Sequence, residues 1–297
     1  MKSYQNLLRD ILTLGENHND RTGVGTVSLF GYQFRHDMRS GFPLLTTKQL
    51  PFRHIFEELA WFLRGSTDNK ELQDRKVTIW NEWSTAEKCA KFHRQENDLG
   101  PIYGWQWRHY GATYTSLNFR STEQQMFPNI NSGFDQIDWL LNEIKINPFS
   151  RRLIVTGWNP IDAQDVELPP CHTIWQLKCN AKRQMSLHLY ARSIDAFLGL
   201  PFNIASYALL LEMLCITCGY EAKELIISFG DLHIYKNHIE QVAEQLYREP
   251  MKLPRITFMR GDQFEIYSLD YLLSMRYDHF DLIGYNPQPK IPAPVAI

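Results

Sequence analysis

One cysteine in this sequence is held in a way that suggests covalent chemistry. Cys171 follows two prolines and precedes His172 in the run LPPCH (168–172). Proline fixes the backbone angle φ and donates no hydrogen bond, so the double proline disfavours a helix interior and a central strand. The double proline instead fixes the next residue, Cys171, at the edge of a helix or strand. A thiol beside an imidazole indicates nucleophilic catalysis, and the alternative is a buried cysteine with His172 as a packing neighbour.

Several arginines stand where a phosphate group could be bound. Arg151 and Arg152 open an apolar run, Arg21 lies in a glycine-containing turn, and Arg192 is followed by Ser193 at the end of an expected strand. Guanidinium groups bind phosphate through two parallel hydrogen bonds. Each arginine taken alone is typical of a solvated surface. Together, in a nearly neutral protein, they favour an anionic ligand.

Two further stretches concentrate polar side chains. The segment 230–238, GDLHIYKNH, places Asp231, His233 and Tyr235 two residues apart, which puts them on one face of a strand. That face is either a binding surface or simply the solvent side of the strand. Asn203 stands near the start of an expected helix, where helix capping is the ordinary role of an asparagine.

The remaining cysteines do not form a recognisable metal or disulfide pattern. Cys215 and Cys218 have the C-x-x-C spacing, but they lie in a very apolar helical pattern without a second such pair, which predicts two small core residues. Five cysteines is an odd number and their spacing is not that of a disulfide framework. We therefore expect no metal and a reducing, cytoplasmic location.

Composition excludes several classes of protein. The 297 residues are 44% hydrophobic, enough for a large core, and 31 Lys and Arg nearly balance 33 Asp and Glu. A dedicated nucleic-acid or membrane binder would usually show a basic excess. The amino-terminal residues read as an amphipathic helix without the apolar segment of a secretory signal. The longest apolar run, Ile204 to Cys218, contains Glu212 and is predicted to be too short to span a bilayer.

Helices and strands that could position these residues alternate irregularly along the chain. Predicted helices cover 54–65, 134–148 and 204–219, and predicted strands cover 22–36, 151–158, 172–179, 185–192 and 224–235. The absence of regular strand-helix-strand units favours an α+β fold with a large mixed sheet over a doubly wound fold. No linker divides the chain, so one domain over 1–297 is expected. Residues 85–99 and 113–133 are polar and irregular and are expected to be surface loop insertions.

Taken together, the motifs resemble the thymidylate synthase family over nearly the whole chain. The stretches are DRTGVGT (20–26), FPLLTTK (42–48), EELAWFLRG (57–65), IWNEW (79–83), LGPIYGWQWRHYGA (99–112), SRRLIV (150–155), LPPCH (168–172), RSIDAFLGLPFNIASY (192–207), GDLHIYKNH (230–238) and APVAI (293–297). They occur in family order and at family spacing. The resemblance implies a single α+β domain that pairs with a second copy through back-to-back sheets.

The resemblance also implies a reaction, the reductive methylation of dUMP by 5,10-methylenetetrahydrofolate, which yields dTMP and dihydrofolate. Uracil C5 is a poor nucleophile, but a thiolate that adds to C6 turns C5 into an enolate carbon. Cys171 is implied to be that nucleophile, and Arg192 is the expected cation that favours its thiolate. Glu58 is implied to be the general acid and base, and Tyr103 to help remove the C5 proton. His172 is expected in the polar network under the base.

The family pattern assigns the parts of dUMP to named side chains. The phosphate is expected among Arg21, Arg192 and Ser193, with Arg151 and Arg152 supplied by the second subunit of a homodimer.

The ribose and the base are assigned in the same way. His233 and Tyr235 are expected to hold the ribose hydroxyl. Asn203 is expected to match uracil O4 and N3–H, because its amide both accepts and donates. Relatives that act on cytosine nucleotides carry Asp at that position, so Asn203 favours uracil.

The folate is expected on the other side of the base. Asp195 is implied to bind the pterin edge, and it also counts among the catalytic and dUMP-site residues. The other implied folate contacts are Lys48 at the glutamate tail and Ile79, Trp80, Trp83, Leu168, Gly199, Phe202, Ala296 and Ile297. The C-terminal lid, 292–297, and Trp80 are expected to exclude water, so that an exocyclic methylene takes hydride from the folate. The folate is then both carbon donor and reductant, without a nicotinamide.

Three positions depart from the family pattern and leave alternatives open. Ala191 replaces a common Gln, Asn81 a common Asp, and Pro51 a residue that is often basic or polar. One alternative is therefore a uridylate hydroxymethylase, which adds water at the end. Another is a cysteine hydrolase that uses Cys171 and His172. A third is a non-catalytic or RNA-binding role, including binding of its own mRNA, which these residues neither indicate nor exclude.

Overall fold

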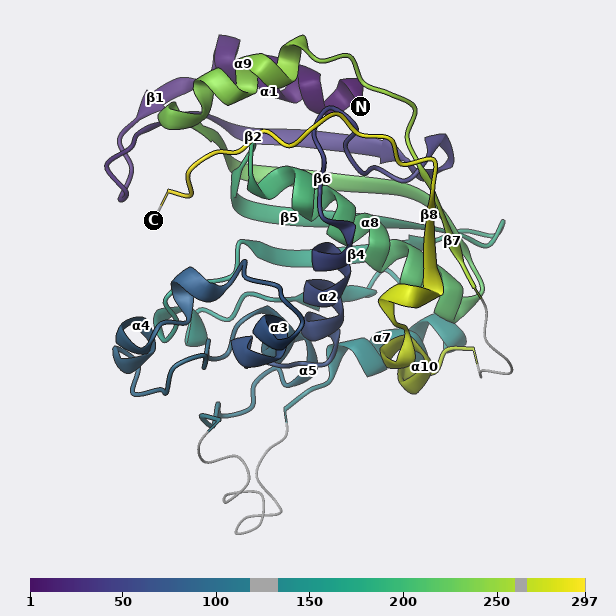
Figure 1. Cartoon of the computed structure of the whole chain (residues 1–297). Helices are drawn as coiled ribbons and strands as arrows, with labels where there is room; N and C mark the ends of the chain where they lie inside the picture. Colours follow the sequence, from purple (N-terminus) through teal and green to yellow (C-terminus); the bar gives the residue numbers. More distant parts are fainter. Residues whose placement is uncertain (118–132, 260–265, 297) are drawn as a thin grey trace.

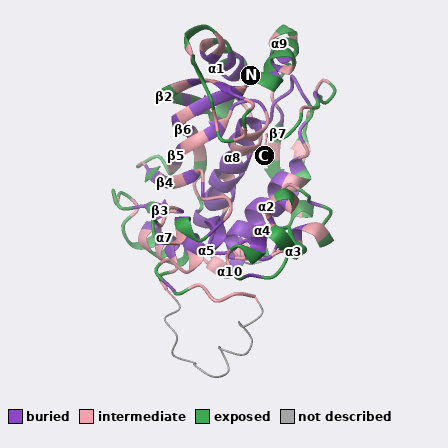
Figure 2. Cartoon of the chain, turned by 90° about the vertical axis from the view of Figure 1, so that its left-hand side faces the viewer, coloured by how far each residue is buried: buried purple, intermediate pink, exposed green. Residues whose placement is uncertain are grey.

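A six-stranded mixed sheet forms one side of the molecule, and helices pack against one of its faces (Figure 1 and Figure 2). The computed structural model describes residues 1–117, 133–259 and 266–296. The strand order is β1-β2-β6-β5-β4-β3, and β5 and β6 are parallel while the other neighbours are antiparallel. The strands are β1 Glu16–His18, β2 Thr26–Asp37, β3 Ile154–Thr156, β4 His172–Cys179, β5 Gln184–Asp195 and β6 Glu221–Tyr235. A separate ribbon pairs β7 Arg255–Phe258 with β8 Phe280–Ile283.

Helices and short 3-10 turns connect these strands. The α-helices are α1 Lys2–Leu14, α2 Phe52–Leu63, α3 Asn69–Asp74, α4 Ala86–Ala90, α5 Tyr103–Arg108, α7 Gln136–Ile146, α8 Gly199–Cys218, α9 Ile239–Tyr247 and α10 Leu269–Ser274. The 3-10 helices are Met38–Ser40, Asn81–Trp83, Asp162–Gln164, Lys236–His238 and Tyr277–His279. The predicted α+β class with a large mixed sheet is confirmed.

The core lies between the sheet and α8. Along β5, Met185, Leu187 and Leu189 are fully buried, whereas the alternating His188 and Tyr190 are exposed. This period of two places one face of the sheet against α8, which packs on β5 and β6. Figure 2 shows α2 and α8 on that buried side.

Helix α8 is apolar on all sides because it is enclosed by the rest of the protein. At 20 residues it is longer than the apolar run suggested, and by length and composition alone it could cross a membrane. Of its most apolar window, 72% is buried inside the protein, as in the core helix of a soluble domain. The helix ends at Gly219, whose φ of 68° is the left-handed conformation that glycine adopts without strain. Cys215 and Cys218 are buried free thiols, as predicted.

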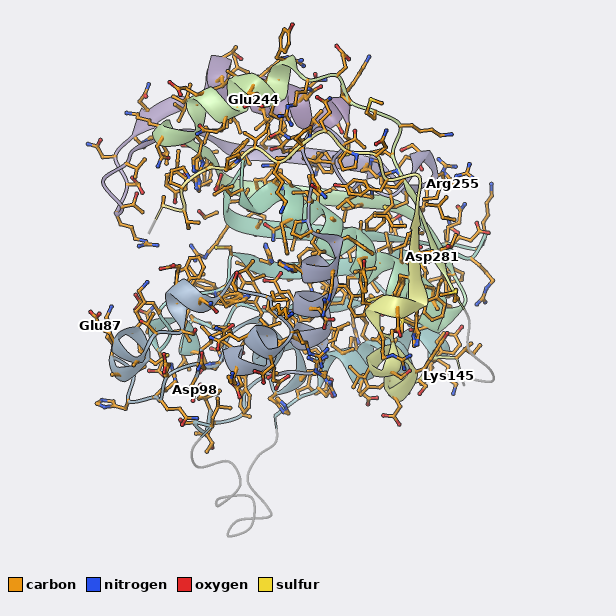
Figure 3. The ribbon with its side chains drawn as sticks, in the orientation of Figure 1. Glu87, Asp98, Lys145, Glu244, Arg255 and Asp281 are labelled. Carbon is orange, nitrogen blue, oxygen red and sulfur yellow. The ribbon has the colours of Figure 1, made fainter. Side chains whose placement is uncertain are left out.

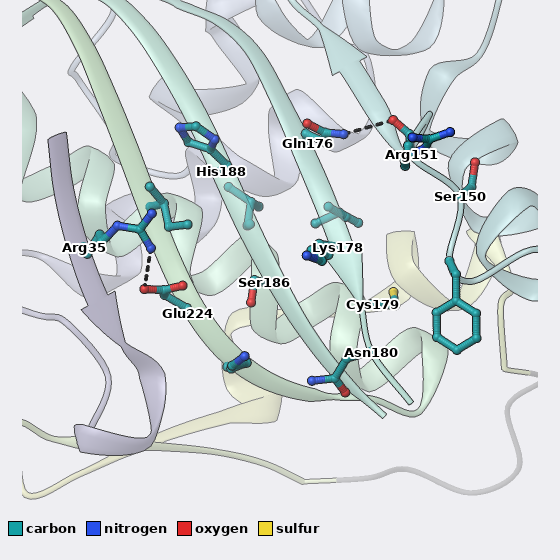
Figure 4. A pocket seen from close by; sticks show the side chains of 15 residues that line it. Arg35, Ser150, Arg151, Gln176, Lys178, Cys179, Asn180, Ser186, His188 and Glu224 are labelled. Carbon is teal, nitrogen blue, oxygen red and sulfur yellow. Dashed lines mark hydrogen bonds and ion pairs between the residues drawn. The ribbon is translucent and has the colours of Figure 1, made fainter. Parts of the chain in front are cut away.

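The opposite face of the sheet carries exposed apolar side chains. Phe30 is 87% exposed, and Ile174 and Tyr190 are about two-fifths exposed. A hollow of about 610 Å³ opens on the same side, lined by β4, β5 and β6 residues together with Arg35 and Arg151 (Figure 4). Exposed large apolar side chains on an uncovered sheet face are a feature of protein–protein interfaces.

The structure describes the two expected loop insertions to different extents. Residues 85–99 contain the short helix α4, and the side chains of Cys89, Arg94 and Asp98 are buried while most of the other residues of this segment are exposed. Asp98, labelled in Figure 3, accepts hydrogen bonds from Ser116 Oγ and Leu117 N and so ties down residues 113–117. Residues 118–132 lie outside the described residues.

Candidate active site

Cys171 lies just before β4 and is fixed by its backbone. Its N–H donates to the Tyr103 hydroxyl at 2.8 Å, and its carbonyl accepts from the Arg192 N–H at 2.9 Å. The first of these bonds spans 68 residues of sequence. The pairing of β4 with β5 is irregular between His172 and Ile174, as at a β-bulge, which re-aims side chains at a strand end. The predicted rigid placement of Cys171 is thus achieved by β5 and α5 as well as by the prolines.

The Arg192 side chain binds the double proline. Its Nε donates to the Pro170 carbonyl at 2.9 Å and its Nη2 to the Pro169 carbonyl at 2.8 Å. The guanidinium also lies 5.3 Å from the centre of the Trp158 ring. A planar guanidinium binds two neighbouring carbonyls through two separate nitrogens in a fixed geometry, whereas the three donors of an ammonium share one nitrogen. Arg192 therefore holds the loop that presents the thiol.

The surroundings of Cys171 favour the thiol over the thiolate. Burial raises its pKa, and Arg192, Tyr103 and Arg21 only partly oppose that effect. The charge of Arg192 acts in the direction expected from the sequence, but desolvation outweighs it. Any nucleophilic attack by the sulfur would therefore require loss of the thiol proton.

His172 is a neutral member of a buried polar group. Burial lowers its pKa to about 4, although the Asn203 side chain opposes this. Its ring lies between Tyr103, at 5.4 Å, and Tyr207, at 5.1 Å. An imidazole with such a low pKa does not form the thiolate–imidazolium pair of a cysteine hydrolase.

Glu58 is a buried carboxyl on α2 with a pKa suited to proton transfer. Burial raises its pKa to about 7, and the hydrogen bond from Trp80 opposes this rise. Trp80 Nε1 donates to Glu58 Oε1 at 2.8 Å. A group with a pKa near 7 can both donate and accept a proton at neutral pH.

Tyr103 lies between the aromatic side chains near Glu58 and the backbone of Cys171. Its ring stacks on Phe62 at 4.9 Å and lies 5.8 Å from the ring of Trp80. Burial, followed by the charge of Cys171, raises the pKa of Tyr103 well above its ordinary value. The tyrosine therefore remains a neutral hydroxyl that accepts from the backbone of Cys171.

The ends of the parallel strands β5 and β6 bring the remaining groups together. Ser193 pairs with Asp231 and Asp195 with His233, and His233 Nδ1 lies 2.7 Å from Asp231 Oδ1. This contact confirms that Asp231 and His233 share one face.

Tyr235 lies in the same cluster. Its ring is 5.0 Å from that of His233. Burial raises the pKa of Tyr235, and the charges of Asp195, Arg21 and Cys171 also act on it. The charges of Asp195, Arg21 and Cys171 are therefore near enough to Tyr235 to influence its hydroxyl.

The comparison with known families agrees with this geometry. The model of the thymidylate synthase family matches residues 2–297. The chain belongs to the thymidylate synthase family. Enzymes of this family are methyltransferases that convert dUMP to dTMP with methylenetetrahydrofolate as the cosubstrate, and the match identifies the chain as such an enzyme.

Arg151 and Arg152 lie apart from this cluster. Both are exposed in the turn before β3. The Arg151 carbonyl accepts from Gln176 Nε2 at 3.0 Å, and its side chain lines the hollow on the uncovered sheet face (Figure 4). Neither arginine is among the groups whose charge acts on Cys171.

Trp80 and Trp83, both expected to contact the folate, lie against each other. Trp83 lies 6.0 Å from Trp80, ring to ring. Three others are partly buried and pack against the core, namely Ile79, Leu168 and Phe202. Gly199 begins α8, and Ala296 is partly buried near the end of the chain. Ile297 lies outside the described residues.

Lys48 has a different environment from the one expected at a glutamate tail. Its side chain is buried, Nζ donates to the Phe197 carbonyl, and the ammonium lies 3.6 Å above the Phe197 ring. Burial lowers its pKa to about 7, partly offset by the charge of Asp195. Lys48 therefore contacts the loop before α8 through Phe197.

Two of the departures from the family pattern have clear environments. Ala191 is fully buried between His172 on β4 and Phe229 on β6, so its position belongs to the core of the sheet. Asn81 Oδ1 accepts from Asn69 Nδ2 at 3.0 Å and from Gln73 Nε2 at 3.3 Å. The amide is thus part of a neutral network beside Trp80.

Sequence reasoning missed three side chains of the site. Tyr207 packs on His172, Trp158 lies against Arg192, and His238 lies 3.8 Å from Asp195. Tyr207 lies in the motif 192–207 and His238 in the motif 230–238. Their residue types did not mark them as site residues, and only their contacts in the folded structure do so. Among the described residues, no group of three His, Cys, Asp or Glu side chains is arranged to hold a metal ion.

Proposed function

We propose that the chain methylates dUMP through a covalent bond between Cys171 Sγ and C6 of the pyrimidine. In this reaction 5,10-methylenetetrahydrofolate supplies both the carbon and the hydride, and the products are dTMP and dihydrofolate, as de novo dTMP synthesis requires. The observation that best supports the reaction is a thiol fixed between Arg192 and Tyr103, with the buried carboxyl of Glu58 on the same aromatic cluster.

The thiol adds to C6 as its proton leaves. Arg192 and Arg21 lower the energy of the transient thiolate, opposing the burial that keeps the free thiol neutral. The electrons released onto the ring collect at O4, where a hydrogen-bond donor stabilises them. Glu58 relays protons to and from the pyrimidine through water, and the Tyr103 hydroxyl assists removal of the C5 proton.

Asn203 reads the base. Its amide donates to O4 and accepts from N3–H, a match that cytosine does not offer. Neutral His172 interacts with the Asn203 side chain and so fixes which way the amide faces. His233 and Tyr235 hold the ribose hydroxyl from the end of β6.

The phosphate is bound across a homodimer. Arg21, Arg192 and Ser193 come from one chain, and Arg151 and Arg152 come from its partner. The uncovered sheet face, with Phe30, Ile174 and Tyr190 exposed, is the surface that pairs. This arrangement explains why Arg151 lies on that face and away from Cys171 of its own chain.

The folate lies against Trp80 and Trp83, with Asp195 at its pterin edge. The C-terminal lid, 292–297, closes over it and keeps water from the exocyclic methylene. Hydride from the folate then adds to the methylene and expels Cys171 Sγ from C6, which gives dTMP, dihydrofolate and the free thiolate.

Four of the five cysteines are buried and all are free, which supports a reducing, cytoplasmic location.

Product analysis tests the proposal. Purified protein is incubated with dUMP and methylenetetrahydrofolate, and both products are identified by mass, with the Cys171→Ser variant as a blank. We expect dTMP and dihydrofolate in equal amounts. Hydroxymethyl-dUMP with tetrahydrofolate would move the activity to hydroxymethylation, and a reaction that is independent of folate would overturn the proposal.

A further inference from the structure

His238 joins the end of the chain to Asp195. It closes the 3-10 helix Lys236–His238, and its side chain is fully buried. Nε2 lies 2.7 Å from the Pro294 carbonyl oxygen, and Nδ1 lies 3.8 Å from Asp195 Oδ1. Asp195 Oδ1 in turn accepts from the Phe197 and Leu198 N–H groups at the start of α8. One imidazole thus connects the C-terminal segment with the loop that carries Asp195.

The two partners of His238 impose a protonation requirement. A carbonyl and a carboxylate can only accept hydrogen bonds. A neutral imidazole has one N–H, so when Nε2 donates to Pro294 the lone pair of Nδ1 faces the carboxylate of Asp195. An imidazolium has an N–H on each nitrogen and satisfies both partners. Nδ1 is buried and has no hydrogen-bond partner at the present 3.8 Å.

Groups from several elements surround the ring. Asp195 faces it from the end of β5, Lys48 acts on it from the segment before α2, and the Tyr235 ring lies 5.6 Å away on β6. Burial lowers the pKa of His238, but Asp195 and the Pro294 carbonyl outweigh burial, so the pKa is raised. Lys48 acts in the opposite direction.

We propose that His238 is a positioning residue that holds residues 292–296 in register with Asp195, and that protonation of the imidazole tightens this connection. The consequence for folate rests on the function proposed above, because Asp195 and the C-terminal lid are its folate-side elements. Protonated His238 makes both bonds. As the pH rises through its pKa, one of the two is lost, and the C-terminal segment is held less firmly.

A protease assay tests the connection without any substrate. Carboxypeptidase removes residues from the C-terminus, and the rate of release reports how firmly the segment before it is held. His238→Gln keeps a donor for Pro294 but cannot become a cation. We expect release to be about tenfold faster than from the unmodified chain, the factor that loss of one charge-assisted hydrogen bond produces.

His36→Gln is the matched control. His36 is also buried, and its Nε2 lies 2.8 Å from a backbone carbonyl oxygen, that of Gly41. It pairs with Leu225 on β6, ten residues along that strand from Tyr235, or about 33 Å. Equal release rates from the His36→Gln and His238→Gln variants would overturn the proposal.

The unmodified chain provides a second measurement that does not depend on a variant folding. Release is measured at pH 6 and pH 8.5, each relative to a free peptide of the same terminal sequence, which corrects for the protease. We expect release from the folded chain to rise relative to the peptide at the higher pH. A constant ratio would overturn the part of the proposal that concerns protonation.

The reaction gives a separate readout. In His238→Gln we expect the KM for methylenetetrahydrofolate to rise about tenfold and more hydroxymethyl product to form, with the affinity for dUMP unchanged. An equal loss of affinity for dUMP would mark a purely structural role and contradict the proposal. Because the protease assay needs no substrate, it remains decisive even if the proposed reaction fails.

Discussion

The indole N–H of Trp80 donates to Oε1 of Glu58 across 2.8 Å, and both side chains are buried. The bond joins α2 to the segment that carries the expected folate wall. The residue expected to exclude water therefore also orients the carboxyl that is proposed to relay protons. Burial raises the pKa of Glu58, and the hydrogen bond from Trp80 lowers it. Loss of that hydrogen bond should therefore raise the pKa of Glu58, and loss of burial should lower it.

Replacing Glu58 by Gln should increase stability while it reduces turnover. The pKa of Glu58 is raised from 4.5 to about 7, so the folded chain binds the proton more tightly than the unfolded chain. The folded state therefore loses stability as the pH rises from 4.5 to 7, by about 3 kcal/mol in total. Urea unfolding should show Glu58→Gln more stable by up to that amount at pH 8 and unchanged below pH 4.5. We expect turnover to fall about 100-fold or more.

The neighbouring carboxylate provides the control for this experiment. Glu57 is also buried on α2, but Arg75 Nη1 lies 2.7 Å from its Oε2. Glu57→Gln breaks an ion pair and should lower the free energy of unfolding. Equal effects of the two substitutions would contradict the distinction between an unpaired and a paired carboxyl.

Replacing Arg192 by Lys should make Cys171 less reactive. A lysine ammonium donates from a single nitrogen, so it cannot reproduce the geometry in which Nε and Nη2 bind the carbonyls of Pro170 and Pro169, and its charge is less well placed to stabilise the thiolate. The pH profile for alkylation of Cys171 by iodoacetamide, followed by mass spectrometry, should move upward by about one pH unit. Arg183→Lys is the control, since Arg183 donates to the carbonyls of Cys218 and Gly219 in the same manner, distant from Cys171 in sequence. An unchanged profile in Arg192→Lys would refute this role.

The Cys171→Ser variant should lose turnover by about 10⁴-fold or more, because an alkoxide is not available at neutral pH. Binding of dUMP, measured by calorimetry, should remain detectable, since the phosphate and base contacts are intact. Cys89→Ser, at another free buried thiol, should retain activity. Turnover near that of the unmodified chain in Cys171→Ser would remove the thiol from the mechanism.

The Asn203→Asp variant should change base preference. A carboxylate only accepts, so it loses the match to uracil O4 and gains one to the amino group of cytosine. The ratio of kcat/KM for dCMP to that for dUMP should rise about 100-fold. If the variant keeps the dUMP preference of the unmodified chain, Asn203 does not read the base.

Mixing two inactive variants should restore activity if Arg152 acts across the dimer. A chain with Arg152→Ala keeps Cys171, and a chain with Cys171→Ser keeps Arg152. In a mixed dimer one site combines the intact thiol with the partner's intact arginine. Random exchange should recover about a quarter of the unmodified activity. Recovery would not occur if Arg152 served its own chain.

The sequence by itself determined the local features. The double proline restricts φ within two residues, the period of two in β5 sets which side chains are buried, and Gly219 ends α8 because it accepts a positive φ. The fold class and the family followed from such patterns. The helix at Ala86–Ala90 did not, because five residues are too few to show a helical period.

Tertiary structure alone decided the electrostatics of the site. Burial leaves the Cys171 thiol protonated despite Arg192, places Lys48 on Phe197, and separates Arg151 from the thiol of its own chain. Each outcome depends on which groups from distant segments displace water or bring charge. A pKa is set by that surrounding shell, and the sequence neighbours of a residue supply only a small part of it.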